Sequence, residues 1–99
     1  MEIRKETDGN SLTIFLGGKL DALAAREFDK EIKTSLDGVT ALTIDFKDLA
    51  YVASAGLRSL LTAQKRMDKQ GSMKILHVAP QVREVFEITG FNEFLSIEE

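Results

Sequence analysis

The feature that most constrains the fold of this 99-residue chain is a hydrophobic period that switches between two and about 3.6 residues. Leu12, Ile14 and Leu16 occupy alternate positions, which is typical of a half-buried strand. Phe28 and Ile32 then recur four residues apart, which places them on one face of a helix. Further strand-like and helix-like segments follow in turn. Strands that alternate with helices pair in parallel through right-handed crossovers.

Turn and capping residues divide this pattern into elements. Strands are expected around Glu2–Thr7, Leu12–Leu16, Val39–Phe46 and Met73–Ala79, with a short final strand at Phe94–Ile97. Helices are expected over 22–36, 55–70 and 80–89, and Gly17-Gly18, Gly71 and Gly90 are expected to end the elements before them. The sequence therefore predicts a single α/β domain over residues 1–99. Its sheet has four to five strands, mixed but mostly parallel, with an N-terminal hairpin and about three packed helices.

One face of each predicted helix supplies the expected core. The residues expected to be buried are Phe28, Ile32, Leu57, Leu60, Leu61, Val85 and Phe86. The charged residues of the second helix are expected to face water: Arg58, Lys65, Arg66 and Lys69. Asp21 stands just before the first helix, where a carboxylate caps free N–H groups.

Composition excludes several classes of function. The net charge is −3 with both signs interspersed, so no basic stripe suits a nucleic acid. There is no cysteine, which excludes disulfides, thiolate zinc sites and a cysteine nucleophile. No apolar run approaches the roughly 20 residues of a membrane helix, and the N-terminus lacks a signal-peptide core. We therefore expect a cytoplasmic protein that binds neither membrane nor nucleic acid.

Three candidate chemical sites carry little weight. His77, the single histidine, is expected to be a half-buried strand residue without catalytic or metal-binding partners. The Gly-Gly-Lys run at 17–19 lacks both the earlier glycine and the following hydroxyl of a phosphate-binding loop. Asp45 and Asp48 are expected at a solvated strand end. No enzyme activity, cofactor or metal is expected.

Ser54 is the residue with the clearest chemical use. It precedes a helix whose first residues leave backbone N–H groups unpaired, so it is expected to be the N-cap. A phosphate on the same side chain is also stabilised there, because free N–H groups and the positive end of the helix dipole face it. The two interpretations are compatible, and spacing alone does not choose between them.

Three short motifs give the chain a family resemblance. Gly18-Lys19-Leu20-Asp21 resembles the G-x-L-D signature of STAS domains, and residues 45–52 resemble the strand and lead-in to that family's switch loop. Ala53-Ser54-Ala55-Gly56-Leu57-Arg58 is similar to the family's D/S-S-x-G-L signature. The motifs are in register along essentially the whole chain.

The resemblance implies partner switching by an anti-sigma factor antagonist. Such a protein, when dephosphorylated, binds an anti-sigma factor that is also a serine kinase; phosphorylation of the switch serine releases it, and a serine phosphatase resets it. By position the phosphorylation site is Ser54, and Asp21 matches the family aspartate near the switch serine. The expected partner-binding residues are Asp21, Ala53, Ser54, Ala55, Gly56 and Arg58. The alternative is a STAS accessory subunit of a lipid or anion transport system.

The sequence departs from the family at two places. Ala53 stands where relatives often have Asp or Ser, which alters the electrostatics beside Ser54 and is expected to affect kinase selectivity or rate. The terminal helix of many relatives is expected to be missing or very short.

Overall fold

A computed structural model describes residues 1–98, in which strands and helices follow one another as the sequence predicts. The elements are β1 (Glu2–Asp8), β2 (Ser11–Leu20), α1 (Ala22–Ser35), β3 (Ala41–Val52), α2 (Ser54–Gln70), β4 (Ser72–Leu76), α3 (Pro80–Thr89) and a 3₁₀ helix, η1 (Phe91–Glu93). No helix within residues 1–98 has both the length and the apolar character needed to span a membrane.

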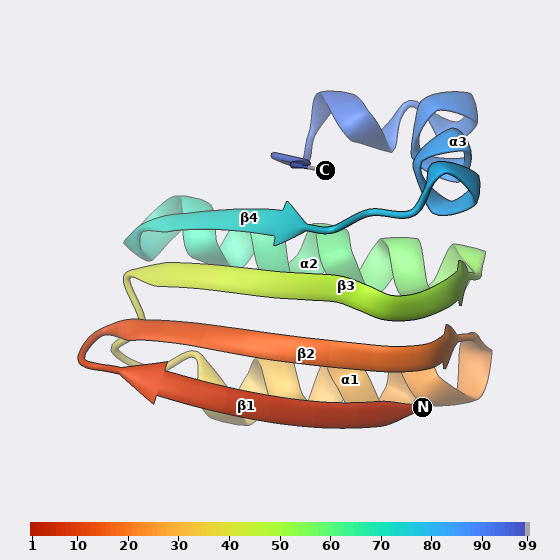
Figure 1. The fold of residues 1–99 in the computed structure, drawn as a ribbon. Coiled ribbons are helices and arrows are strands. Elements are labelled where there is room, and N and C mark those ends of the chain that lie inside the picture. Colours follow the sequence, from red (N-terminus) through yellow and green to blue (C-terminus); the bar gives the residue numbers. More distant parts are fainter. Residues whose placement is uncertain (99) are drawn as a thin grey trace.

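The four strands form one sheet in the order β1-β2-β3-β4, with α1 and α2 on the same face (Figure 1). β1 and β2 pair antiparallel as a hairpin, and the pairs β2–β3 and β3–β4 are parallel. This confirms the predicted mixed, mostly parallel sheet with an N-terminal hairpin. Because β2 and β3 run in the same direction, α1 and α2 both begin at the same end of the sheet (Figure 1).

The core lies between the sheet and the helices, and most of its predicted members are buried. Five of the expected residues are at most 3% exposed: Phe28, Ile32, Leu57, Leu60 and Phe86. Leu61 and Val85 are only partly buried, which corrects the prediction. The buried face of α2 instead includes the small residues Ser59 and Ala63.

Strands β2 and β3 are both longer than predicted. Gly17-Gly18 does not end β2, which continues to Leu20, and β3 passes Phe46 to reach Val52. The pairing of these strands shifts register on both sides of Gly17-Gly18, which marks bulges in the ladder. The bulges absorb the irregularity that the glycines introduce, so the two strands stay paired up to the residues before α1 and α2.

The C-terminal strand predictions are only partly right. β4 ends at Leu76, because His77 has a left-handed backbone (φ 58°) that no strand residue adopts. No strand forms over Phe94–Ile97; within the described residues this segment makes a single parallel bridge, between Ile97 and Ile75. Ile75 forms two backbone hydrogen bonds there, through its N–H and its carbonyl.

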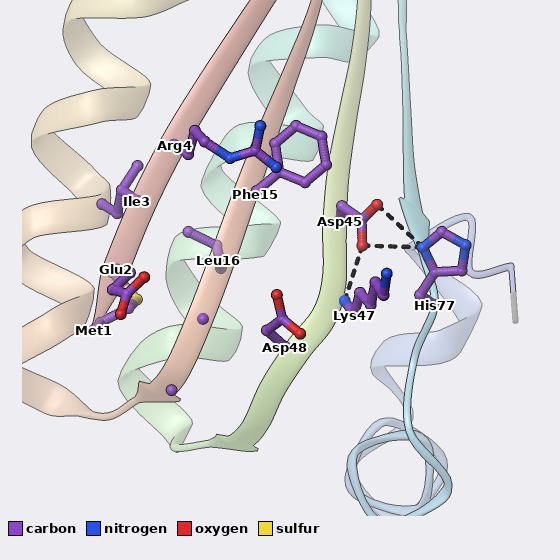
Figure 2. A pocket seen from close by; sticks show the side chains of 12 residues that line it. Met1, Glu2, Ile3, Arg4, Phe15, Leu16, Asp45, Lys47, Asp48 and His77 are labelled. Carbon is purple, nitrogen blue, oxygen red and sulfur yellow. Dashed lines mark hydrogen bonds and ion pairs between the residues drawn. The ribbon is translucent and has the colours of Figure 1, made fainter.

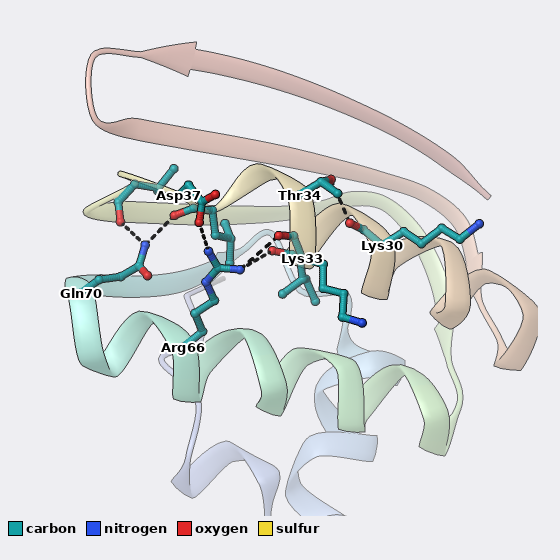
Figure 3. Close-up of polar contacts among 9 residues, drawn as sticks. Lys30, Lys33, Thr34, Asp37, Arg66 and Gln70 are labelled. Atoms are coloured by element: carbon teal, nitrogen blue, oxygen red, sulfur yellow. Dashed lines mark hydrogen bonds and ion pairs between the residues drawn. The ribbon is translucent and has the colours of Figure 1, made fainter.

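Arg66 does not face water as predicted but fastens α2 to the end of α1 (Figure 3). Its guanidinium donates to the carbonyl oxygens of Ile32 at 3.1 Å and Lys33 at 3.3 Å, and to Asp37 at 2.6 Å. The last carbonyls of a helix have no partner within that helix. Arg66 therefore acts as a C-terminal cap supplied by another helix.

The end of α2 holds the same region from the other side. Gln70 donates from Nε2 to the carbonyl oxygens of Leu36 at 2.6 Å and Val39 at 2.7 Å. The predicted stop at Gly71 is confirmed, although its φ of 172° is ordinary extended backbone. A Cβ at residue 71 would lie 1.9 Å from the carbonyl oxygen of Thr40. Close approach to that backbone, and not a left-handed turn, requires glycine here.

An ion pair ties β1 to α1. Lys5 Nζ lies 2.8 Å from Glu31 Oε2, which also accepts a hydrogen bond from Ser35. The hydrogen bond from Lys5 holds the pKa of Glu31 below its usual value, against the opposing effect of partial burial. The pair stabilises the attachment of the hairpin to the helical layer.

Candidate functional site

The candidate site is built where β2 and β3 end side by side. Their register pairs Leu20 with Val52, so Asp21 and Ala53 follow neighbouring strand ends. The N–H of Ala53 donates to the carbonyl oxygen of Leu20 at 2.9 Å and holds the two chain segments together. Ser54 comes next along the chain. The parallel register thus brings Asp21 and Ser54, 33 positions apart in the sequence, to one edge of the molecule.

Asp21 caps α1, as the sequence predicts. It has an extended backbone, and its Oδ1 accepts a hydrogen bond from the N–H of Ala24 at 2.9 Å. The residue is exposed. Its carboxylate is therefore fixed in direction by the helix it caps and remains open to solvent or to a partner.

Ser54 is not the N-cap of α2, which corrects the prediction. Ala53 takes that position, with an extended backbone and no side-chain hydrogen bond to the helix, and Ser54 is the first helical residue. The hydrogen bond from Ala53 N–H to Leu20 fixes residue 53 in the sheet-like conformation, and Leu57 N–H closes the first turn on the Ala53 carbonyl at 3.1 Å. Ser54 is exposed.

The start of α2 consequently lacks a side-chain cap. Within residues 1–98, no protein group accepts from the backbone N–H groups of Ser54, Ala55 or Gly56. Such groups carry the positive end of the helix dipole and stabilise a negative charge placed near them. An exposed hydroxyl at this end can accept a phosphoryl group without an unfavourable electrostatic contact with its own helix.

The other predicted site residues share this turn but differ in exposure. Arg58 is exposed, Ala53 and Ala55 are half-buried, and Gly56 is buried. Arg58 follows Ser54 by one helical turn, so its side chain starts on the same face of α2. The exposed members, Asp21, Ser54 and Arg58, are the ones that a partner can reach.

Two exposed apolar residues at this end were not predicted. Leu23, in the first turn of α1, is 76% exposed, and Tyr51, near the end of β3, is 49% exposed. Tyr51 lies opposite Lys19 in the parallel ladder, one position before the Leu20–Val52 pair. The sequence does show a single leucine among the alanines of 22–25. Whether Leu23 is exposed depends on how α1 is rotated against the sheet, which the sequence does not indicate. Large exposed apolar side chains beside polar groups are typical of protein-binding surfaces.

A second polar cluster lies on the open face of the sheet (Figure 2). His77 Nδ1 is 3.0 Å from each carboxylate oxygen of Asp45, and Oδ1 of Asp45 also accepts from the N–H of Lys47 at 2.8 Å. Asp45 is 7% exposed, so it is not the solvated strand end that was predicted, whereas Asp48 is exposed. His77 is exposed and lies outside the strand, contrary to the prediction of a half-buried strand residue.

An open groove of about 790 Å³ adjoins this pair, and Gly17 and Gly18 are among the residues that line it. Within residues 1–98, no group of three or more side chains is arranged to hold a metal ion. The pair between His77 and Asp45 joins the loop after β4 to the middle of β3, and Ser54 does not line this groove.

Comparisons with known proteins agree with this fold. Residues 3–97 match the family described as "Mlab, STAS domain". BtrV of Bordetella bronchiseptica, named as a candidate anti-sigma factor antagonist, is 32% identical over 93 residues, which cover 92% of this chain and 80% of that protein.

Solved structures with low sequence identity share the architecture. An anti-sigma factor antagonist from Mycobacterium paratuberculosis has a TM-score of 0.87 at 19% identity, covering 98% of this chain and 84% of that one. SpoIIAA in its unphosphorylated form has a TM-score of 0.78 at 22% identity, covering 99% of this chain and 87% of that one. A sulfate transporter family protein from Wolinella succinogenes has a TM-score of 0.80 at 13% identity, covering 95% of this chain and 80% of that one. The match over residues 3–97 shows that this chain belongs to the STAS domain family.

Proposed function

We propose that residues 1–99 act as one STAS domain that serves as an anti-sigma factor antagonist. In its dephosphorylated state it binds an anti-sigma factor with serine kinase activity, and phosphorylation of Ser54 releases that partner. The observation that carries the proposal is an exposed Ser54 at the uncapped start of α2, at the same edge as Asp21. The name of the relative BtrV supports the same class of function, and SpoIIAA is a protein solved in both unphosphorylated and phosphorylated forms.

The chemistry requires nothing from this chain beyond a reachable hydroxyl. Ser54 Oγ attacks the γ-phosphorus of ATP held by the kinase; the Oγ–P bond forms, the bond from that phosphorus to the β,γ-bridging oxygen breaks, and ADP leaves. The hydroxyl proton passes to a base of the kinase. A serine phosphatase reverses the modification by hydrolysis. The chain itself acts as a binding module without catalysis or cofactor.

Phosphorylation acts on the interface and leaves the fold in place. The phosphate brings about −1.5 to −2 charges at neutral pH. The free N–H groups of the first turn stabilise this charge in the separated domain. In the complex the same dianion must lose water, and it meets any carboxylate of the partner that faces it. Each 1.4 kcal/mol of such a cost weakens binding about tenfold.

The partner surface includes the residues around Ser54. Asp21 and Arg58 offer charges of opposite sign, and Leu23 and Tyr51 offer apolar area at the same end of the domain. Ala53 leaves this surface without the acid or hydroxyl that relatives often carry beside the switch serine, which lowers negative charge there. The proposal places the protein in the cytoplasm, with no role for nucleic acid or membrane.

The test combines modification with binding. Purified protein is incubated with ATP and each candidate anti-sigma factor kinase of the same genome, and mass spectrometry locates the phosphate. Binding to the kinase is then titrated for wild type, Ser54→Ala and Ser54→Asp. We expect phosphate on Ser54, tight binding by Ser54→Ala, and weak binding by a normally folded Ser54→Asp. Phosphate at another residue, or equal affinity of all three proteins, would refute the proposal.

A second candidate function is an accessory subunit of a lipid or anion transport system. The family description "Mlab, STAS domain" and the fold shared with a sulfate transporter family protein favour it. This role needs a permanent docking surface and makes no use of a modifiable Ser54. Affinity purification of the tagged chain separates the two: recovery of a transport complex, unchanged by Ser54→Asp, would support the transporter role.

A further inference from the structure

The first turn of α2 rests directly on the last residue of β2. Leu20 is fully buried, and its carbonyl accepts the hydrogen bond from Ala53. Its side chain lies against Gly56: a Cβ at residue 56 would sit 2.7 Å from Cγ, 2.9 Å from Cδ2 and 3.0 Å from the carbonyl oxygen of Leu20. Real Cβ atoms essentially never come closer than 3.0 Å to another heavy atom, so a side chain at residue 56 requires either the buried Leu20 or the first turn of α2 to shift.

The opposite end of the helix pair is fixed. Arg66 and Gln70 hold the C-terminal end of α1 and the loop that follows it through four carbonyl oxygens (Figure 3). Gly71 lies against the backbone of Thr40. Because α2 is held there, it cannot slide as a whole to relieve an overlap at Gly56. The displacement would be concentrated in the first turn, which carries Ser54.

We propose that Leu20 and Gly56 are positioning residues that set Ser54 relative to Asp21. Asp21 follows Leu20 directly, and Ser54 precedes Gly56 by two residues on the same turn. The Leu20–Gly56 contact therefore fixes the distance between the hydroxyl that is modified and the neighbouring carboxylate. The contact between Leu20 and Gly56 does not depend on the proposed function. Its consequence, recognition of Ser54 by the kinase, rests on that function.

The contact predicts an effect opposite to helix propensity. Replacing glycine by alanine inside a helix ordinarily favours the helix. Gly56→Ala should instead lift the first turn from Leu20 and weaken the hydrogen bond from Ala53. Gly17→Ala is the matched control, because its Cβ would meet Asp48 and Glu2 at ordinary distances of 3.6 Å and 3.8 Å. Both variants add one methyl group, and only the first creates an overlap.

The contact is tested without any partner by amide hydrogen exchange measured by NMR. The readout is the exchange rate of the Ala53 amide divided by that of Ile44, an amide in the central strand β3, which removes changes in global stability. We expect this ratio to rise about tenfold in Gly56→Ala and to stay unchanged in Gly17→Ala. Leu20→Ala combined with Gly56→Ala removes Cγ and Cδ2 from the overlap, so the ratio should return toward wild type. If that double variant does not fold, the larger Gly56→Ser must raise the ratio at least as much as Gly56→Ala.

The consequence is tested with the kinase and ATP. Phosphorylation of Ser54 should be about tenfold slower in Gly56→Ala than in wild type and normal in Gly17→Ala, with recovery in the double variant. An unchanged exchange ratio in Gly56→Ala overturns the inference, and so does a raised ratio with an unchanged rate. If no kinase modifies wild-type Ser54, the proposed function fails, and the exchange ratio alone decides whether the contact positions the turn.

Discussion

Replacing Arg66 by methionine tests how α2 holds the end of α1. Methionine keeps the helix propensity and most of the apolar stem of the side chain, and it removes all of the hydrogen bonds. Two of these bonds go to the carbonyl oxygens of Ile32 and Lys33. At about 0.5–1.5 kcal/mol each, they contribute about 1–3 kcal/mol.

The ion pair within this contact adds little. Asp37 has a side chain that is 91% exposed, so its attraction to Arg66 is screened by water. In the variant, water also forms hydrogen bonds to the carbonyl oxygens that Arg66 no longer contacts, because this end of α1 is near the surface. We therefore expect Arg66→Met to lower the free energy of unfolding by about 1–2 kcal/mol.

Urea denaturation followed by circular dichroism measures the loss. Lys65→Met is the matched control, an exposed neighbour whose replacement should change stability by less than about 0.5 kcal/mol. Asp37→Asn isolates the ion pair and should likewise change little. Equal stabilities for Arg66→Met and Lys65→Met would show that the interhelical cap contributes nothing, and that the account of the fixed helix pair is wrong.

Three further changes test other parts of the account. Leu60→Ala should cost about 2–5 kcal/mol in denaturant melts, because Leu60 is fully buried; a loss below about 0.5 kcal/mol would mean that the inner face of α2 is misassigned. Ala53→Asp supplies the missing N-cap of α2 and should raise the free energy of unfolding by about 0.5–2 kcal/mol. It should also change the rate of phosphorylation, because the new carboxylate occupies the N–H groups beside Ser54. Equal phosphorylation rates for the two proteins would show that the kinase does not recognise residue 53. Lys5→Met should lower stability by less than about 1 kcal/mol at neutral pH. The pKa of Glu31 is lowered in the folded state, so the stability difference between wild type and Lys5→Met is present above pH 4.5, the usual pKa, and should vanish as the pH falls through the folded pKa. A stability difference that persists in acid would contradict the ion-pair explanation.

Features set by neighbours in the sequence were predictable. The cap at Asp21, the end of the first helix near residue 36 and the start of the third helix at residue 80 each depend on a few adjacent residues, and all three appear in the structure. The alternation of periods likewise predicted a mixed, mostly parallel sheet with an N-terminal hairpin, which the structure has. Local signals are sufficient where capping, turn chemistry and hydrophobic period agree.

Features set by residues far apart were not predictable. Ser54 was expected to be the N-cap, but the hydrogen bond between Ala53 and Leu20 moves that position back by one residue. Asp45 and His77 are 32 residues apart and meet only in the assembled sheet. Arg66 has the spacing of a surface residue and finds its acceptors only once α1 packs beside it. No property of a single segment indicates such contacts.

The central claim is that Ser54 switches an interface without unfolding the domain. The most direct measurement compares wild type, unmodified and phosphorylated at Ser54, in a binding titration with the anti-sigma factor kinase and in a thermal melt. The account predicts at least a tenfold loss of affinity, about 1.4 kcal/mol, together with melting temperatures that nearly coincide. An affinity that phosphorylation leaves unchanged, or a phosphorylated protein that has lost its fold, would contradict it.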